Sequence, residues 1–398
     1  MYQNSKTTQN KICGDCGLSS LHHINTWIEG LLEPIFPFFG KIQTLKKLEK
    51  ITNIFFEKFF TFFKIASIKD YSPKDNVAPR SKCFIEEGIK HGLKFKVIHG
   101  PFGPTNNFQM IKNGKIRRFT GLPLAEFKSK WSPAIVDDKK FVKKILKRGG
   151  LPVAEGKSFW FFQKNKALKY GKHLGFPLVV KPRGGSVSRH VTLDITNEAS
   201  LKTAINCAIK YSPSFIVEKF IANTFVHRIT IIDFDFIAIA KEEPANILGD
   251  GVSQIRALID KKNEKLLNAG LHKIVENEIT EKLLKEQGYD FSSTPKKNEK
   301  IYLQKDPFVR LGADIIEMTP EIHSENLKLF RDIAKIFDIK VVGIDFLAKD
   351  ISIPYHMQNC AILELNSLPA IEIHHFPSVG KPENPASALV KMVLKYYF

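Results

Sequence analysis

Three side chains with oxygen donors near the C-terminal end of the chain have the types and spacing of a magnesium site. Asp345 lies at the end of the apolar run VVGIDF, and Glu364 and Asn366 belong to the run ILELN. Residues two apart on a strand point to one face, so we expect Glu364 and Asn366 side by side, with Asp345 on a strand alongside. Hard oxygen ligands of this kind suit Mg2+ bound together with substrate phosphates. The same residues also fit acidic strand ends that face solvent, and both interpretations stay open on these residues alone.

A second group of candidate residues is basic or glycine-rich. Lys181 follows the apolar run FPLVV, so a strand would carry its side chain to a cleft, where a lysine can neutralise phosphate charge. Residues 184–188 read GGSVS, and such a loop can present N–H groups and hydroxyls to phosphates. Each feature alone is more often an ordinary surface feature. These residues alone do not decide between a nucleotide site and ordinary surface features.

The elements that must position these side chains alternate between helix and strand from residue 81 onward. SKCFIEEGIKHG and DDKKFVKKILKRGG predict helices, and the second has acidic residues before it and glycines after it. FQMIKNGKIRRF predicts a hairpin, because Asn113-Gly114 suits a type I′ turn. The remaining predicted elements are helices in KALKYGKHLG and ASLKTAINCAIKY, and strands in LKFKVIHG, FPLVVKP, SFIVEKF, RITIID and FDFIAIAK.

The first part of the chain has a different pattern. Residues 21–68 read as basic amphipathic helices, which could dock on the body of the protein, dimerise or lie on an anionic membrane surface. Pro73, Pro79 and the charges between them indicate a linker. Cys13 and Cys16, followed by His22 and His23, have some zinc-like character, but the helical pattern starts at once, and a terminal helix with two thiols is the alternative.

Composition excludes some classes of protein and leaves others open. The chain of 398 residues is long enough for two or three packed lobes. The formal net charge of +19 is spread over nearly every segment, and no nucleic-acid-binding module is recognisable. Charges interrupt the phenylalanine-rich stretch around residues 54–68 before it reaches the length of a membrane span. The start of the chain lacks the apolar region of a secretory signal, so we expect a cytoplasmic protein.

The order of segments from residue 137 to 377 resembles the ATP-grasp ligases, and among them the ATP-grasp portions of cyanophycin synthetase and bifunctional glutathione synthetase. The motifs that carry the resemblance include FPLVVKPRGG, FIVEKFI, PANILGDGVSQIRALIDKKN, GIDFLAKDI and ILELNSLPA. The resemblance implies an α/β (α+β) fold of two lobes that clasp ATP. The implied organisation is an N-terminal amphipathic helical segment (1–78), a small α/β pre-ATP-grasp unit (79–136) and an ATP-grasp domain (137–398) with lobes at 137–217 and 218–398.

The resemblance also implies cofactors and residue roles. The cofactors are ATP and Mg2+, with two ions expected and Glu364 bridging them. Lysines and the flexible glycine–serine loop would hold phosphates, the segment after the FIVEK strand would hold adenine, and arginines would stabilise the transferring group. The implied residues are Lys139, Lys181, Lys241, Gly185, Ser186 and Ser188 for phosphates, Glu218, Lys219 and Phe220 for adenine, Asp345, Glu364 and Asn366 for metal, and Arg228 and Arg310 for the transferring group.

Three departures from the family pattern bear on activity. The phosphate loop has Ser188 and His190 where cyanophycin synthetase-like sequences carry glycines. The acid expected at the ribose is missing, and His227 is the candidate substitute. The segment 304–312 differs from the relatives' acceptor segment, so the substrate should differ, with Arg310 as a candidate carboxylate contact.

The predicted activity is an ATP-dependent carboxylate-amine ligase that forms an amide through an acyl phosphate, with ADP and phosphate as products. The expected partners are a small carboxylate and an amine, such as amino acids or small peptides. Nucleic acid is not expected, membrane-surface contact by the N-terminal helices is the less favoured option, and a homo-oligomer is possible. The alternative is a non-catalytic descendant that binds a nucleotide or a peptide.

Overall fold

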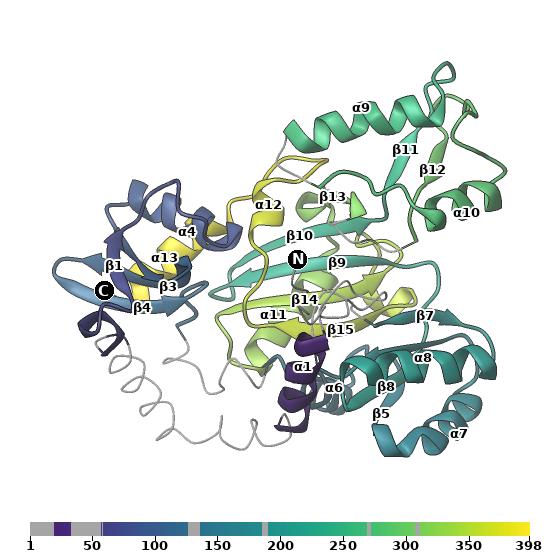
Figure 1. Ribbon diagram of the computed structural model, residues 1–398, viewed down its shortest axis with the longest axis horizontal. Helices are drawn as coiled ribbons and strands as arrows, with labels where there is room; N and C mark the ends of the chain where they lie inside the picture. Colours follow the sequence, from purple (N-terminus) through teal and green to yellow (C-terminus); the bar gives the residue numbers. More distant parts are fainter. Residues whose placement is uncertain are drawn as a thin grey trace, which may run out of the picture. The chain divides into compact units, whose positions relative to one another are not determined.

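A computed structural model describes residues 20–32, 57, 59–125, 136–184, 190–268, 272–305, 307 and 311–398. These residues form two compact units (Figure 1). The described part of the first unit consists of 20–32, 136–184, 190–223 and Ala361–Glu364, and the second unit contains the rest. Within the amphipathic segment predicted over 21–68, residues 33–56 and 58 lie outside the described residues, as do Cys13, Cys16 and the loop 185–189.

The first unit is built on an antiparallel four-stranded sheet in the order β5-β8-β6-β7. Its core contains Leu178, Val180 and Val217 from the sheet, with Leu201 and Ala204 from a covering helix. The bounds of its elements are α1 (Ser20–Leu32), α6 (Lys139–Arg148), β5 (Gly156–Trp160), η2 (Phe161–Gln163), α7 (Lys164–Leu174), β6 (Leu178–Pro182), β7 (Thr192–Ile195), α8 (Glu198–Tyr211) and β8 (Ser214–Lys219).

The register of β6 and β8 determines which side chains point away from this core. Leu178 and Val180 alternate with Val179 and Lys181, so the latter two lie on the opposite face. Glu218 pairs with Val179 across the two strands and therefore shares that face with Lys181. The predicted strands FPLVVKP and SFIVEKF are thus confirmed, and together they present one acidic and one basic side chain away from the core.

Helix α6 begins where the sequence predicts it and has a strong N-cap. The Asp138 side chain accepts hydrogen bonds from the Lys140 and Phe141 N–H groups at 2.9 and 3.1 Å. Asp138 also pairs with Arg183, just after β6, at 3.3 Å. Val142 and Leu146 are the buried residues of the helix. The cap and the apolar positions together fix which lysines of α6 point toward the sheet.

A five-stranded sheet in the order β13-β10-β9-β14-β15 belongs to the second unit, except for residues Ala361–Glu364 of β15, which group with the first. Its antiparallel pairs include the predicted hairpin of RITIID with FDFIAIAK and the pairing of VVGIDF with the first of these strands. The bounds of these elements are β9 (Phe225–Ile232), β10 (Phe236–Glu243), β13 (Asp314–Glu317), η4 (Thr319–Glu321), α11 (Ser324–Ile336), β14 (Val341–Ala348), η5 (Tyr355–Met357), β15 (Ala361–Asn366) and α12 (Glu372–His375).

A small two-stranded ribbon with two helices also belongs to the second unit. It consists of β11 (Asn246–Leu248), β12 (Lys300–Tyr302), α9 (Ile255–Asn268) and α10 (Glu278–Glu286). Ile247, Ile259 and Leu284 belong to its own buried cluster. The PANILGDG motif therefore marks a separate packed subregion rather than an extended loop.

The third part of the second unit is an antiparallel sheet in the order β1-β2-β3-β4 with two helices beside it (Figure 1). Asn113 and Gly114 have φ values of 47° and 74°, which confirms the predicted type I′ turn between β3 and β4. The bounds are β1 (Ser67–Asp70), α4 (Pro79–Lys90), β2 (Lys94–Gly100), β3 (Gly103–Lys112), β4 (Lys115–Thr120) and α13 (Pro385–Tyr396).

Two features of this part differ from the sequence-based expectation. The helical segment expected to reach Ile68 ends earlier, because Ser67–Asp70 forms β1, which pairs with β2. Leu389 and Val393 of α13, far away in the sequence, complete the apolar core of this sheet.

Among the described residues, no helix is long and apolar enough to span a membrane.

Candidate functional site

Glu218 is the centre of the charged cluster in the first unit. Its carboxylate accepts a hydrogen bond from Lys143 Nζ at 2.8 Å and lies 2.5 Å from Lys181 Nζ. The residue is only 4% exposed. Burial by itself would raise the pKa of Glu218, but the two ammonium groups outweigh it and lower that pKa. Glu218 is therefore an ionised carboxylate held between lysines from two elements.

The same helix carries a second lysine to a second carboxylate. Lys139 Nζ lies 3.0 Å from Glu364 Oε2. Lys139 and Lys143 are four residues apart and so lie on one side of α6. The structure therefore brings the sequence-predicted residues Lys181 and Glu218 together with Lys143, which the sequence reading did not single out. Lys139, from the same helix, pairs instead with the predicted residue Glu364.

The segment after Glu218 is held by backbone bonds to its neighbours. The N–H of Lys219 donates to the Glu155 carbonyl at 2.8 Å, and the N–H of Phe220 donates to the Pro177 carbonyl at 3.1 Å. The Lys219 ammonium donates to the carbonyls of Gly175 and Phe176, both at 3.0 Å. Adenine contacts through Lys219 and Phe220, as the resemblance implies, would therefore use their carbonyl oxygens.

The polar centre of the second unit is Arg228. It pairs across the strands with Asp345, to which its Nη1 donates, and its Nε donates to Glu242 Oε1 at 3.0 Å. The two carboxylates raise the pKa of Arg228 against the opposing effect of burial. Arg228, Glu242 and Asp345 share one face of the sheet, because Arg228 pairs with both Asp345 and Ala240.

Asn366 lies near the same face. A Cβ atom placed on Gly343 would be 3.5 Å from the Asn366 Cβ, and Gly343 alternates with Asp345 along β14. Glu364 and Asn366 alternate in the same way along β15. Asp345 and Asn366 thus lie on one face as predicted.

The side chains of Asp345, Glu364 and Asn366 carry the oxygen donors that a hard divalent cation prefers. The predicted ligands are two carboxylates and one amide, and both carboxylates already face a cationic side chain, Lys139 or Arg228, that supplies positive charge where an ion would. Within the described ranges, no three His, Cys, Asp or Glu side chains gather as alternative metal ligands.

Lys241 lies on the other face of the second-unit sheet. It pairs with His227, whose neighbour Arg228 points to the face of Asp345. Its ammonium sits 4.7 Å from the centre of the Phe225 ring. The structure therefore does not bring Lys241 together with Arg228 and Asp345, although the resemblance assigns it to the phosphates.

His227, the suggested substitute for the missing ribose acid, is fully buried. Its Nδ1 lies 3.2 Å from the Phe225 carbonyl oxygen. Burial and the nearby Lys241 lower its pKa to about 4, so the ring is neutral near pH 7. A buried neutral imidazole does not replace an exposed carboxylate, and this expectation is not supported.

Several predicted residues cannot be placed. Gly185, Ser186, Ser188 and Arg310 lie outside the described residues. The sequence reading also missed Lys143 and Glu242. For Lys143 the available signal was its spacing of four from Lys139, and for Glu242 it was the alternation along β10.

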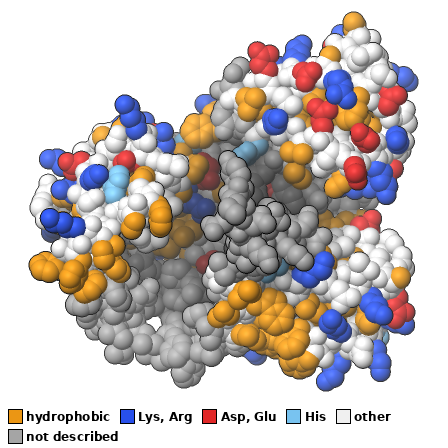
Figure 2. All heavy atoms as spheres, in the orientation of Figure 1, with side chains coloured by type: hydrophobic (Ala, Val, Ile, Leu, Met, Phe, Trp, Pro, Cys, Tyr) orange, Lys and Arg blue, Asp and Glu red, His pale blue; other side chains and the backbone are white. Residues whose placement is uncertain are grey.

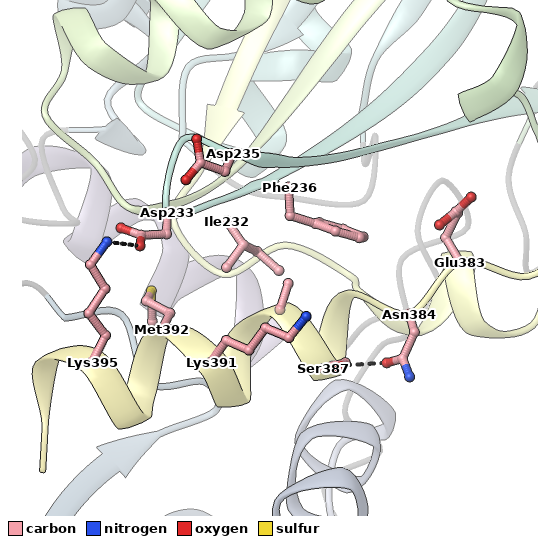
Figure 3. Close-up of a pocket in the computed structure, with 11 residues that line it drawn as sticks. Ile232, Asp233, Asp235, Phe236, Glu383, Asn384, Ser387, Lys391, Met392 and Lys395 are labelled. Carbon is pink, nitrogen blue, oxygen red and sulfur yellow. Dashed lines mark hydrogen bonds and ion pairs between the residues drawn. The ribbon is translucent and has the colours of Figure 1, made fainter.

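A pocket of about 540 Å³ lies elsewhere in the second unit, between the β9–β10 turn and α13 (Figure 3). Asp233 and Lys395 pair at 2.7 Å at one end of it, and Ile232, Phe236 and Met392 supply apolar walls. None of the predicted site residues lines it. On the face shown in Figure 2, basic side chains are interspersed with acidic ones rather than gathered in one patch.

The chain is similar in sequence to cyanophycin synthetases and to bifunctional glutathione biosynthesis proteins. The chain is 29% identical over 339 residues to the cyanophycin synthetase of Trichormus variabilis, covering 83% of this chain and 36% of that protein. It is 27% identical over 329 residues to the glutathione biosynthesis bifunctional protein of Clostridium perfringens, covering 79% and 40%. No family model matches the chain.

A solved structure supports the same fold. The bifunctional glutathione synthetase from Pasteurella multocida superposes with a TM-score of 0.61 and 23% identity, covering 81% of this chain and 44% of that one. These matches confirm the predicted mixed α/β fold and the resemblance to the ATP-grasp superfamily. The chain spans little more than a third of the length of the Trichormus relative, which is 36% covered.

Proposed function

We propose that this protein is an ATP- and Mg2+-dependent carboxylate-amine ligase that forms an amide bond through an acyl phosphate. The observation that carries the proposal is the pairing of Lys143 and Lys181 with the buried Glu218, and of Lys139 with Glu364, in a chain similar to proteins named as synthetases. The substrates are an amino acid or a small peptide, in keeping with the relatives named cyanophycin synthetase and glutathione biosynthesis protein.

The work of the residues in this proposal is positioning and charge neutralisation. Lys139 and Lys181 bind phosphate oxygens, and the carbonyls after Glu218 accept from the adenine edge. Asp345, Glu364 and Asn366 hold Mg2+, which would neutralise the charge that develops as the phosphoryl group transfers. Arg228 holds Asp345 in place until the ion binds, because its guanidinium already spans Asp345 and Glu242.

The first test is Mg2+-dependent release of ADP and phosphate by the full chain, supplied with pooled amino acids and small peptides plus hydroxylamine. We expect a hydroxamate from the wild type, because hydroxylamine traps an acyl phosphate. Glu364→Gln should remove turnover while the urea unfolding midpoint stays near that of the wild type. Normal turnover in Glu364→Gln would contradict the metal assignment.

A matched control is Glu383→Gln, which changes a half-buried carboxylate at the pocket of Figure 3, a pocket that Asp345, Glu364 and Asn366 do not line. It should leave turnover unchanged. Failure of the wild type to bind ATP by calorimetry, with no turnover in any pool, would instead favour the non-catalytic alternative. That alternative draws on Ser188, His190 and the missing ribose acid.

A further inference from the structure

We propose that Lys143 is a positioning residue of the nucleotide site, which neutralises Glu218 when Lys181 turns from that carboxylate to a bound phosphate. The proposal rests on the proposed function, because it assumes that Lys181 meets phosphate. It adds a residue outside the predicted set and a reason for the unusual arrangement of two lysines on one buried carboxylate.

The geometry gives the two lysines different attachments. Lys181 ends a strand on the face opposite the core, and its ammonium is 2.5 Å from Glu218 Oε1. Lys143 comes from the middle of α6 and binds the other oxygen, Oε2, at 2.8 Å. The carboxylate therefore offers one oxygen to each lysine, and either lysine can leave without breaking the other contact.

The burial of Glu218 makes this second contact necessary. An ionised carboxylate that is almost fully buried is strongly disfavoured without a paired cation. If Lys181 were the sole partner of Glu218, movement of Lys181 to a phosphate would leave the buried carboxylate without a cation. Glu218 would then compete with the phosphate for the lysine. Lys143 removes this competition, because it stays on Glu218 in either position of Lys181.

The surroundings hold Lys143 to this role. Burial lowers the pKa of Lys143, and the Glu218 carboxylate opposes this effect. The helix that carries it is fixed by the Asp138 cap and by the pairing of Asp138 with Arg183 at 3.3 Å. Val142, the buried neighbour of Lys143, keeps this side of α6 against the unit. The ammonium is thus pre-placed on Glu218 before a ligand arrives.

The test measures binding of Mg-ATP, Mg-tripolyphosphate and adenosine to the full chain by calorimetry. Tripolyphosphate reports the phosphate subsite without the adenine contacts. We expect Lys143→Met to weaken the binding of Mg-tripolyphosphate and Mg-ATP by about tenfold or more and to leave the binding of adenosine unchanged. Lys143→Arg should restore most of the loss, and Lys144→Met, an exposed lysine of the same helix, should have no effect.

The second arm separates charge from simple structural support. Adding Glu218→Gln to Lys143→Met should return the affinity for tripolyphosphate to near the wild-type value. In the double variant, no unpaired buried carboxylate competes with the phosphate for Lys181. In Lys143→Met alone, the affinity relative to wild type should recover as the pH is lowered and Glu218 becomes protonated. If Lys143 only held α6 in place, Glu218→Gln would not restore the affinity of Lys143→Met for tripolyphosphate. Lys143→Met would then also weaken the binding of adenosine.

The outcomes separate this inference from the proposed function. A wild type that binds neither ATP nor tripolyphosphate would overturn both. A wild type that binds both, with Lys143→Met binding equally well or failing to respond to Glu218→Gln, would overturn the role of Lys143 alone. Urea unfolding of each variant shows that the affinities compare folded proteins.

Discussion

At the scale of single residues, three carboxylates proposed to meet the nucleotide or its metal face cationic side chains of their own unit. Glu218 pairs with two lysines, Glu364 with Lys139, and Asp345 with Arg228. An ionised carboxylate is the form that binds Mg2+, and each of these three has a cation beside it. Binding of Mg-ATP would then exchange one set of ion pairs for another rather than create charge in a neutral site.

His227 gives a residue-scale prediction about pH. Its folded-state pKa is lowered to about 4, below the ordinary value of about 6.5, because the ring is buried and near Lys241. Between those two values the unfolded chain binds the proton and the folded chain does not, so stability is full above about pH 6.5 and falls as the pH drops toward 4. His227 should account for up to about 3 kcal/mol of this loss.

The measurement is urea unfolding at pH 7 and pH 4.5 for the wild type, His227→Phe and His356→Gln. His227→Phe keeps an aromatic ring in the buried site, so the fall in unfolding free energy between the two pH values should be smaller than in the wild type. His356 has a side chain that is 53% exposed and serves as the matched control with wild-type behaviour. An identical pH dependence in all three proteins would contradict the assignment.

At the scale of elements, local patterns in the sequence predicted those that carry the first cluster. The apolar runs around β6 and β8, and the acidic start of α6, gave the strands and the helix at the observed places. The strands β14 and β15, which carry the predicted metal ligands, were also predicted, because VVGIDF and ILELN are apolar runs of strand length. Elements whose identity depends on their own residues were therefore accessible from the sequence.

Relations between elements were not accessible in the same way. Helix α6 contains five lysines in KKFVKKILKR, and their order does not say which ones face a carboxylate. That choice follows from the Asp138 cap and from Val142 and Leu146, which set the rotation of the helix. The face that Lys241 occupies was inaccessible for a similar reason, because it depends on the register of β9 and β10.

Gly156 provides an element-scale prediction, because it pairs with Glu218 across β5 and β8. A Cβ at this position would lie 2.5 Å from the Glu218 Cβ and 2.7 Å from the Val217 carbonyl oxygen. Both contacts are with atoms that cannot simply rotate away. Gly156→Ala should therefore push β5 from β8, lower the unfolding free energy by about 1 to 3 kcal/mol and weaken tripolyphosphate binding by displacing Glu218.

Gly100→Ala is the control for this substitution. Its new Cβ would meet Thr105 Cγ2 at 3.7 Å, an ordinary contact, and Gly100 does not have a positive φ. Urea unfolding should leave this variant near the wild type. A Gly156→Ala protein as stable as Gly100→Ala, with unchanged phosphate affinity, would show that the β5–β8 register tolerates a side chain beside Glu218.

At the scale of the whole molecule, the chain divides its apolar residues among separate cores. The first unit has a cluster around β6, β8 and α8, whereas the second has one that joins the β1–β4 sheet to α4 and α13. The second cluster unites residues 77–125 with residues near the C-terminus, as where the Tyr397 hydroxyl accepts from the Ala125 N–H at 2.9 Å. No local pattern could have predicted this pairing, because each segment alone reads as an ordinary amphipathic element.

Separate cores predict that damage to one unit stays in that unit. Leu201 on α8 and Leu389 on α13 form a matched pair, since both are fully buried leucines on helices of different cores. Each change to alanine should cost about 2 to 5 kcal/mol locally. By hydrogen exchange and mass spectrometry, Leu201→Ala should speed exchange in β6 and β8 and spare β2 and β3, and Leu389→Ala should do the reverse. Faster exchange in both sets from either substitution would mean that the two units open together, because their cores would then share one cooperative transition.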